Sequence, residues 1–137
     1  MIFDKDRPEL VLVDYLISVI KEYQEAQYPE SPVKANLRIG PAVTQLSINY
    51  TITAKEEHQN NPDIPAWLRS PSNITHFMTV TATSITIRRD THDYSDPDSI
   101  PKIIEEIKLT LDRAHTGYHQ SLTNYVSIQK PTEPQNS

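Results

Sequence analysis

The chain has 137 residues, a formal net charge of −5 and no cysteine. This length fits one domain with one core, and the lack of cysteine excludes disulfides, thiolate zinc sites and a cysteine nucleophile. The acidic balance argues against general nucleic-acid binding, which normally needs a basic face. With two glycines against eleven prolines, the chain also has no Gly-rich phosphate loop.

The first predicted element is a helix that begins near Asp6 and Pro8 and ends at about residue 26. Acidic residues precede its apolar run and Asp14 interrupts it, so we expect neither a secretory signal nor a membrane span. A soluble protein, cytoplasmic where it is made, is the expectation. The apolar arc of this helix is wider than an ordinary surface stripe. It predicts either a central helix of a small core or a helix that a second chain partly covers.

Strands are predicted at residues 33–39, 43–54 and 76–89. The second alternates apolar residues with uncharged polar ones, as half-buried antiparallel strands do. The third changes phase near Thr83 and Ser84, which either a β-bulge or a tight hairpin would explain, and we favour the bulge. The outward faces carry hardly any charge. That is typical of a face on which subunits pack, although β-propensity alone also favours threonine.

The connection at residues 55–73 is polar and interrupted by prolines, but residues 64–69 form a short apolar island within it. Tryptophan and arginine are common interface anchors. Two interpretations stay open: the island packs into the core of its own chain, or it binds a neighbouring subunit. Arg88 and Arg89 follow the third strand and either pair with nearby acids or bind a partner. The candidate interface residues are Ile64, Trp67, Leu68, Arg69, Arg88 and Arg89.

A loop at residues 90–99 holds Asp90, Asp93, Asp96 and Asp98, and clustered carboxylates can bind calcium. The loop lacks the glycine and glutamate of an EF-hand, so capping of the next helix is the competing interpretation. The sequence does not decide whether these aspartates bind a cation. No histidine pair has the HExxH spacing of a zinc site. We therefore predict no metal, no cofactor and no catalytic residue.

A second helix is predicted after Pro101, with apolar residues at helical spacing and an end at Gly117. His115 would then lie at the helix end. Residues 125–128 predict a last strand, and residues 131–137 a polar tail. The predicted fold is α+β: an antiparallel or mixed sheet of three to four strands, flanked by two helices, with a long loop between the two main strands. Residues 1–130 form one domain.

This order of elements resembles that of phage tail-terminator and neck proteins and of cap proteins of contractile injection systems. The closest local likeness is the strand at residues 46–54 running into Glu56, Glu57, Asn60, Asn61 and Pro62 before another strand. The resemblance implies a non-enzymatic subunit that forms a homo-oligomeric ring, contacts other tail or tube proteins, and becomes part of a virion or an injection machine. The extra apolar arc of the first helix would then lie at a subunit contact.

A small acidic cytoplasmic binding module is the alternative, such as a secretion chaperone, an immunity protein or a phage-encoded inhibitor. Such a module would be a monomer or dimer that binds one partner through Trp67 or the aspartate loop. A metal-dependent enzyme that uses this loop is a third and weaker interpretation. Neither a membrane nor nucleic acid in general is an expected partner.

Overall fold

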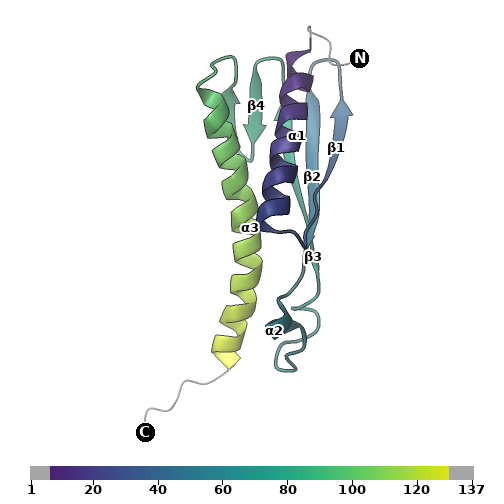
Figure 1. Ribbon diagram of the computed structural model, residues 1–137, viewed down its shortest axis with the longest axis vertical. Helices are drawn as coiled ribbons and strands as arrows, with labels where there is room; N and C mark the ends of the chain where they lie inside the picture. The colour runs from purple at the N-terminus through teal and green to yellow at the C-terminus, as the bar shows by residue number, and fades with distance from the viewer. Residues whose placement is uncertain (1–6, 130–137) are drawn as a thin grey trace.

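The computed structural model describes residues 7–129, which form an antiparallel sheet with two long helices on one of its faces (Figure 1). Its five strands lie in the sheet in the order that they have in the chain. The α+β class is therefore confirmed, with five strands rather than three to four. The predicted tail lies outside the described residues. The elements are α1 (Pro8–Gln27), β1 (Lys34–Ile39), β2 (Thr44–Ile52), α2 (Glu56–Gln59), β3 (Ser72–Val80), β4 (Ser84–Ile87), β5 (Asp90–Asp93) and α3 (Ser99–Gln129).

The core lies between the sheet and the two long helices. Every second residue of β2 is buried, as the alternation predicts. The helices contribute residues spaced three and four apart, which lie on one helical face. The apolar residues at the centre of this core include Leu16 and Ile20 of α1, Leu46, Ile48 and Ile52 of β2, Ile85 of β4, and Ile103, Ile107 and Leu111 of α3.

The predicted long strand at residues 76–89 is wrong, because the chain turns back within it. The N–H of Thr81 donates to the carbonyl of Ser84 at 2.8 Å, and the N–H of Ser84 donates to Oγ1 of Thr81 at 3.0 Å. This tight hairpin, rather than a bulge, explains the change of phase and returns Ile85 to the buried face. A second turn follows at once, so that residues 90–93 are strand β5 and only the rest of the predicted aspartate loop is a loop.

The predicted end of the second helix at Gly117 is also wrong, as is the strand at residues 125–128. Helix α3 continues to Gln129. Gly117 has room on every side, because a Cβ added there would meet no atom within 4 Å. A glycine inside a helix costs only about 1 kcal/mol relative to alanine. Burial of Leu122 beyond it outweighs that cost.

The long loop between β2 and β3, residues 53–71, covers the part of α3 that extends past the sheet (Figure 1). With 31 residues, α3 is about 46 Å long at about 1.5 Å per residue. Ala54 and Ile64 of the loop pack on Leu122 in a second, smaller core. The Tyr118 hydroxyl donates to the Ser70 carbonyl at 2.9 Å. The loop thus has a structural role, as the cover of the C-terminal half of α3.

Candidate functional site

The face of the sheet that points away from the helices has no covering element among residues 7–129. We call its outward side chains the bare sheet face. Phe77 lies at its centre, opposite Ser47, and is 57% exposed. A phenylalanine in this position exposes apolar surface to water. Exposed apolar surface is common where a second protein surface packs. The other uncharged members are polar: Asn36 of β1, Gln45, Ser47, Asn49 and Thr51 of β2, Asn73, Thr75 and Thr79 of β3, Ser84 and Thr86 of β4, and Thr91 of β5.

The three central strands of the bare sheet face carry no charged side chain. Charges occur only on the edge strands, where Lys34 and Arg38 of β1 share this face, as does Asp93 of β5. Hydrogen bonds hold several of the polar side chains in place: Thr51 donates to Asn73 at 2.8 Å, and Thr75 donates to Asn49 at 2.7 Å. The bare sheet face is therefore neutral, partly apolar and fixed in shape.

The helix layer also exposes apolar area. Val11 and Tyr15, one turn apart on α1, are 52% and 50% exposed. They lie on the side of α1 opposite to its buried residues, such as Leu16 and Ile20. The wide apolar arc seen in the sequence is thus only partly buried by the chain itself. Residues 7–129 thus leave an apolar stripe on one side without a partner and the bare sheet face on the other.

Some residues of the apolar island in the long loop lie in the core, and others lie on the surface. Ile64 is fully buried and Leu68 packs beside it, so these two residues plug the chain's own second core. Arg69 closes the loop on itself, because its Nε donates to the carbonyl of Ile64 at 2.8 Å and its Nη1 to that of Gln59 at 2.5 Å. Trp67 is 75% exposed. Trp67 therefore does not pack in the core of its own chain, and it remains a candidate contact to a partner protein.

Arg88 and Arg89 form the two-residue turn between β4 and β5, where Ile87 pairs with Asp90. Both side chains are exposed. Arg88 has a φ of 58°, and it is the one non-glycine residue with positive φ in the part of the chain that the structure describes. This left-handed conformation costs an arginine about 1–2 kcal/mol. Such strain is found preferentially at functional sites.

The four aspartates are not gathered in one cluster in the structure. Within residues 7–129 no group of three or more His, Asp or Glu side chains is placed to hold a metal ion. The Asp93 carboxylate instead accepts hydrogen bonds from the N–H and hydroxyl of Ser95, which lower the pKa of this carboxyl group. Asp96 accepts from the N–H of Asp98 at 3.0 Å. The carboxylates of Asp93 and Asp96 therefore stabilise the turns in which they lie.

A buried cluster of tyrosines and histidines, which was not predicted from the sequence, joins α1, β2, β3 and α3. The imidazole of His115 is only 2% exposed and lies between the rings of Tyr28 and Tyr50, at 3.6 and 5.2 Å between centroids. The Gln24 amide donates to His115 Nε2 at 3.0 Å and to the Ser31 carbonyl at 3.0 Å. His115 is therefore not a helix-end residue, as predicted, but a buried acceptor.

Burial lowers the pKa of His115 and, with the charge of Arg88, that of His76. Burial raises the pKa of Tyr50, whose hydroxyl lies 2.7 Å from His76 Nε2. The Tyr23 hydroxyl donates to Asp112, and burial together with this carboxylate raises the pKa of Tyr23 to about 12. The cluster therefore holds neutral histidines and protonated tyrosines. The cluster connects α1, β2, β3 and α3. Because His115 is buried, a substrate in solvent cannot reach its imidazole.

Comparison with protein-family models, with curated proteins and with solved structures finds no match to this chain. No helix within residues 7–129 is long and apolar enough to cross a membrane.

The sequence carried one signal for the buried cluster. His115 continues the four-residue spacing of Ile103, Ile107 and Leu111, and Leu122 extends the same stripe. That spacing indicates a helix that continues past Gly117 with His115 on its buried side. Nothing in the sequence, by contrast, pairs Tyr50 with His76 or brings Gln24 to His115.

Proposed function

We propose that this protein is a non-enzymatic assembly subunit that forms a homo-oligomeric ring, of the kind that terminates or caps a phage tail or a contractile tube. The bare sheet face is the observation that carries this proposal. A sheet face that stays in solvent, and the edges beside it, usually carry charges that discourage association. Here the centre has none, and Phe77 is left in water.

The contact we propose is head-to-tail. The bare sheet face of one copy packs on the stripe of Val11 and Tyr15 on α1 of the next copy. These two surfaces lie on opposite layers of the molecule, so each subunit presents one to each neighbour. Heterologous contacts of this kind generate a ring when the rotation between subunits closes. The resemblance in element order to tail-terminator, neck and cap proteins supports the ring rather than an open filament.

Trp67 extends the proposal to a second partner. The loop at residues 53–71 projects past the end of the sheet (Figure 1), with Trp67 75% exposed. Tryptophan is among the commonest anchors of protein interfaces. We assign Trp67 to the contact with another tail or tube protein, and the resulting complex would be a virion or injection-machine component.

Mixing two variants tests the head-to-tail contact. Phe77→Glu damages the bare sheet face and Tyr15→Glu damages the α1 stripe, because burying an unpaired charge is strongly unfavourable. Each variant alone should be monomeric in sedimentation velocity. An equimolar mixture should form a one-to-one dimer, since each variant keeps the surface that the other has lost. Two monomeric variants that stay monomeric when mixed would refute the contact.

Glu105→Gln on α3 is a matched control, because its side chain is exposed and belongs to neither the bare sheet face nor the α1 stripe, so this variant should assemble like the wild type. Negative-stain images of the wild-type protein should show closed rings. A wild-type protein that is monomeric or dimeric instead would favour the alternative of a small binding module with a single partner.

A further inference from the structure

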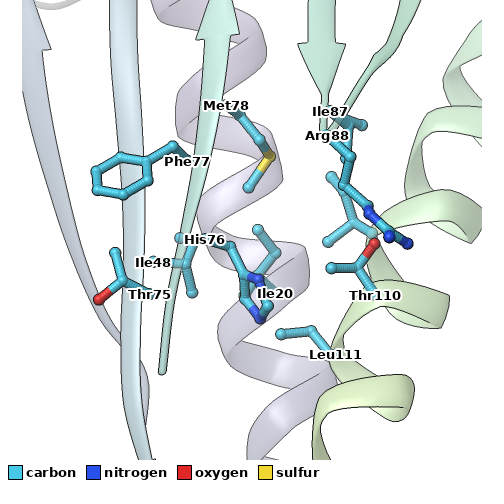
Figure 2. Close-up of a pocket in the computed structure, with 11 residues that line it drawn as sticks. Ile20, Ile48, Thr75, His76, Phe77, Met78, Ile87, Arg88, Thr110 and Leu111 are labelled. Carbon is cyan, nitrogen blue, oxygen red and sulfur yellow. The ribbon is translucent and has the colours of Figure 1, made fainter. Parts of the chain in front are cut away.

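A cavity of about 340 Å³ opens at a step in the sheet (Figure 2). Strand β3 pairs with β2 over its full length, but β4 has only four residues and pairs only with Met78, Thr79 and Val80. Beside residues 72–77 of β3 the described chain therefore has no further strand. Helix α3 passes this edge with the cavity in between, and α1 closes the space from behind (Figure 2).

The walls of the cavity are mainly apolar. Five elements contribute them, namely α1, β2, β3, β4 and α3, as Figure 2 shows in part. A volume of this size falls within the roughly 300–1,000 Å³ of typical small-ligand sites, which are likewise apolar with a few placed polar groups. The apolar lining residues are Ile20, Ile48, Phe77, Met78, Ile87, Ile107 and Leu111.

Two polar groups of the cavity remain available to a ligand. Thr75 and Thr110 also line it, but their hydroxyls already donate to Asn49 and to the Glu106 carbonyl. His76 points from β3 into the cavity, and Arg88 reaches from the end of β4 toward Thr110 (Figure 2). No acidic residue lines the cavity. The Nε2 of His76 is already hydrogen-bonded to the Tyr50 hydroxyl at 2.7 Å, so the polar groups left to a ligand are the Arg88 guanidinium and the Nδ1 of His76.

Arg88 is positioned at some cost to the backbone. Two-residue hairpin turns that need positive φ favour glycine, asparagine or aspartate, yet the chain has arginine with φ at 58°. Among residues 7–129 no carboxylate lies within ion-pair distance of its guanidinium. The charge is therefore free to bind an anion at the mouth of an apolar space.

We propose that this cavity binds a small amphipathic carboxylate. Its apolar chain would fill the space lined by isoleucine, leucine and methionine, while Arg88 binds the carboxylate through charge-assisted hydrogen bonds and His76 donates a further one. The ligand class is a medium-chain or aryl-substituted carboxylic acid. This role goes beyond ring assembly and does not depend on it.

Calorimetric titration with octanoate and octan-1-ol, which share an eight-carbon chain, tests the proposal. The wild-type protein should bind octanoate at least about tenfold more tightly than octanol, as expected for a hydrogen bond to a charged group. Arg88→Gln should remove this preference. Arg89→Gln, its neighbour in the same turn, should leave octanoate affinity within about twofold. Both variants change exposed side chains, so folding should be retained.

Three results would overturn the proposal: no binding of octanoate by the wild type, equal affinity for the two ligands, or octanoate affinity that Arg88→Gln does not reduce. The titration is repeated with Tyr15→Glu, which leaves the cavity lining intact. Octanoate binding by this variant is expected whether or not the ring exists. Failure of the ligand site and failure of ring assembly can thus be told apart.

Discussion

Ile64 and Trp67 lie three residues apart in one loop but have opposite environments. Ile64 is fully buried against Leu122, whereas Trp67 is 75% exposed. Removal of a buried isoleucine side chain leaves a cavity and loses apolar burial, while truncation of an exposed side chain seldom changes stability by more than about 0.5 kcal/mol. The size of a side chain is therefore no guide to its role in this loop.

We predict that Ile64→Ala lowers the free energy of unfolding by about 2–5 kcal/mol. Trp67→Ala should change it by less than about 0.5 kcal/mol. Urea denaturation of a monomeric background, such as Tyr15→Glu, separates folding from assembly. A large loss of stability in Trp67→Ala would mean that the indole packs on its own chain, and would remove Trp67 from the list of partner contacts.

The buried histidines predict how stability depends on pH. Burial lowers the pKa of His76, His115 and His119 below the usual 6.5 of an unfolded chain. Below about pH 6.5 the unfolded chain therefore binds more protons than the folded chain. The free energy of unfolding should be fully present above that pH and should fall as the pH is lowered from 7 to 5.5.

His115→Gln is the matched variant for this pH dependence. Glutamine can still accept the hydrogen bond from Gln24 but does not titrate. Denaturation curves at several pH values should give a shallower decline for the variant than for the wild type, by up to about 1.4 kcal/mol per pH unit for one histidine. Equal slopes would show that His115 is protonated to the same extent in the folded and unfolded chains.

At the scale of elements, α3 differs most from its prediction. Gly117 was expected to end the helix, because glycine is the usual C-cap residue. The helix continues since the loop at residues 53–71 gives its second half a surface to pack on, with Ile64 against Leu122. No local propensity contains that information. It depends on a contact between residues 58 positions apart.

Gly117→Ala tests the continuous helix. The glycine has no atom within 4 Å of an added Cβ, so the substitution introduces no clash. Alanine should raise the free energy of unfolding by about 0.5–1 kcal/mol, because glycine costs more conformational entropy in a helix. Thermal denaturation followed by circular dichroism measures the change. Destabilisation would indicate a left-handed helix end at Gly117, as the sequence alone had suggested.

The alternating pattern of β2 predicted its buried face correctly, and the long loop was predicted with nearly its observed bounds. Both follow from local spacing and from proline placement. The hairpin at Thr81–Ser84 was missed because a bulge and a tight turn produce the same change of phase. The cavity beside β3 was beyond reach from the sequence, because it arises from the difference in length between β3 and β4.

The described chain, residues 7–129, has two layers, a sheet and a pair of long helices, and each layer has a surface that no other described element covers. On one side α1 exposes Val11 and Tyr15, and on the other the sheet exposes Phe77 among uncharged polar side chains. A head-to-tail contact between these surfaces would use both at once. It also explains why the apolar arc of α1 is wider than the chain's own core requires.

The ring predicts where solvent will be excluded. In the assembled protein the bare sheet face and the α1 stripe should be protected, whereas the turn of Arg88 and Arg89 at the edge of the sheet should stay open to solvent and to the proposed carboxylate ligand. The cavity and the ring contacts would therefore occupy neighbouring parts of the surface that share Thr75 and Phe77.

The most direct test of the assembly claim is the absolute mass of the purified protein by light scattering over a concentration series, for the wild type and for Phe77→Glu. A ring predicts a wild-type mass that is a fixed multiple, of three or more, of the 15.7 kDa chain, and a mass of one chain for the variant. A wild-type protein with the mass of one chain at every concentration would contradict it.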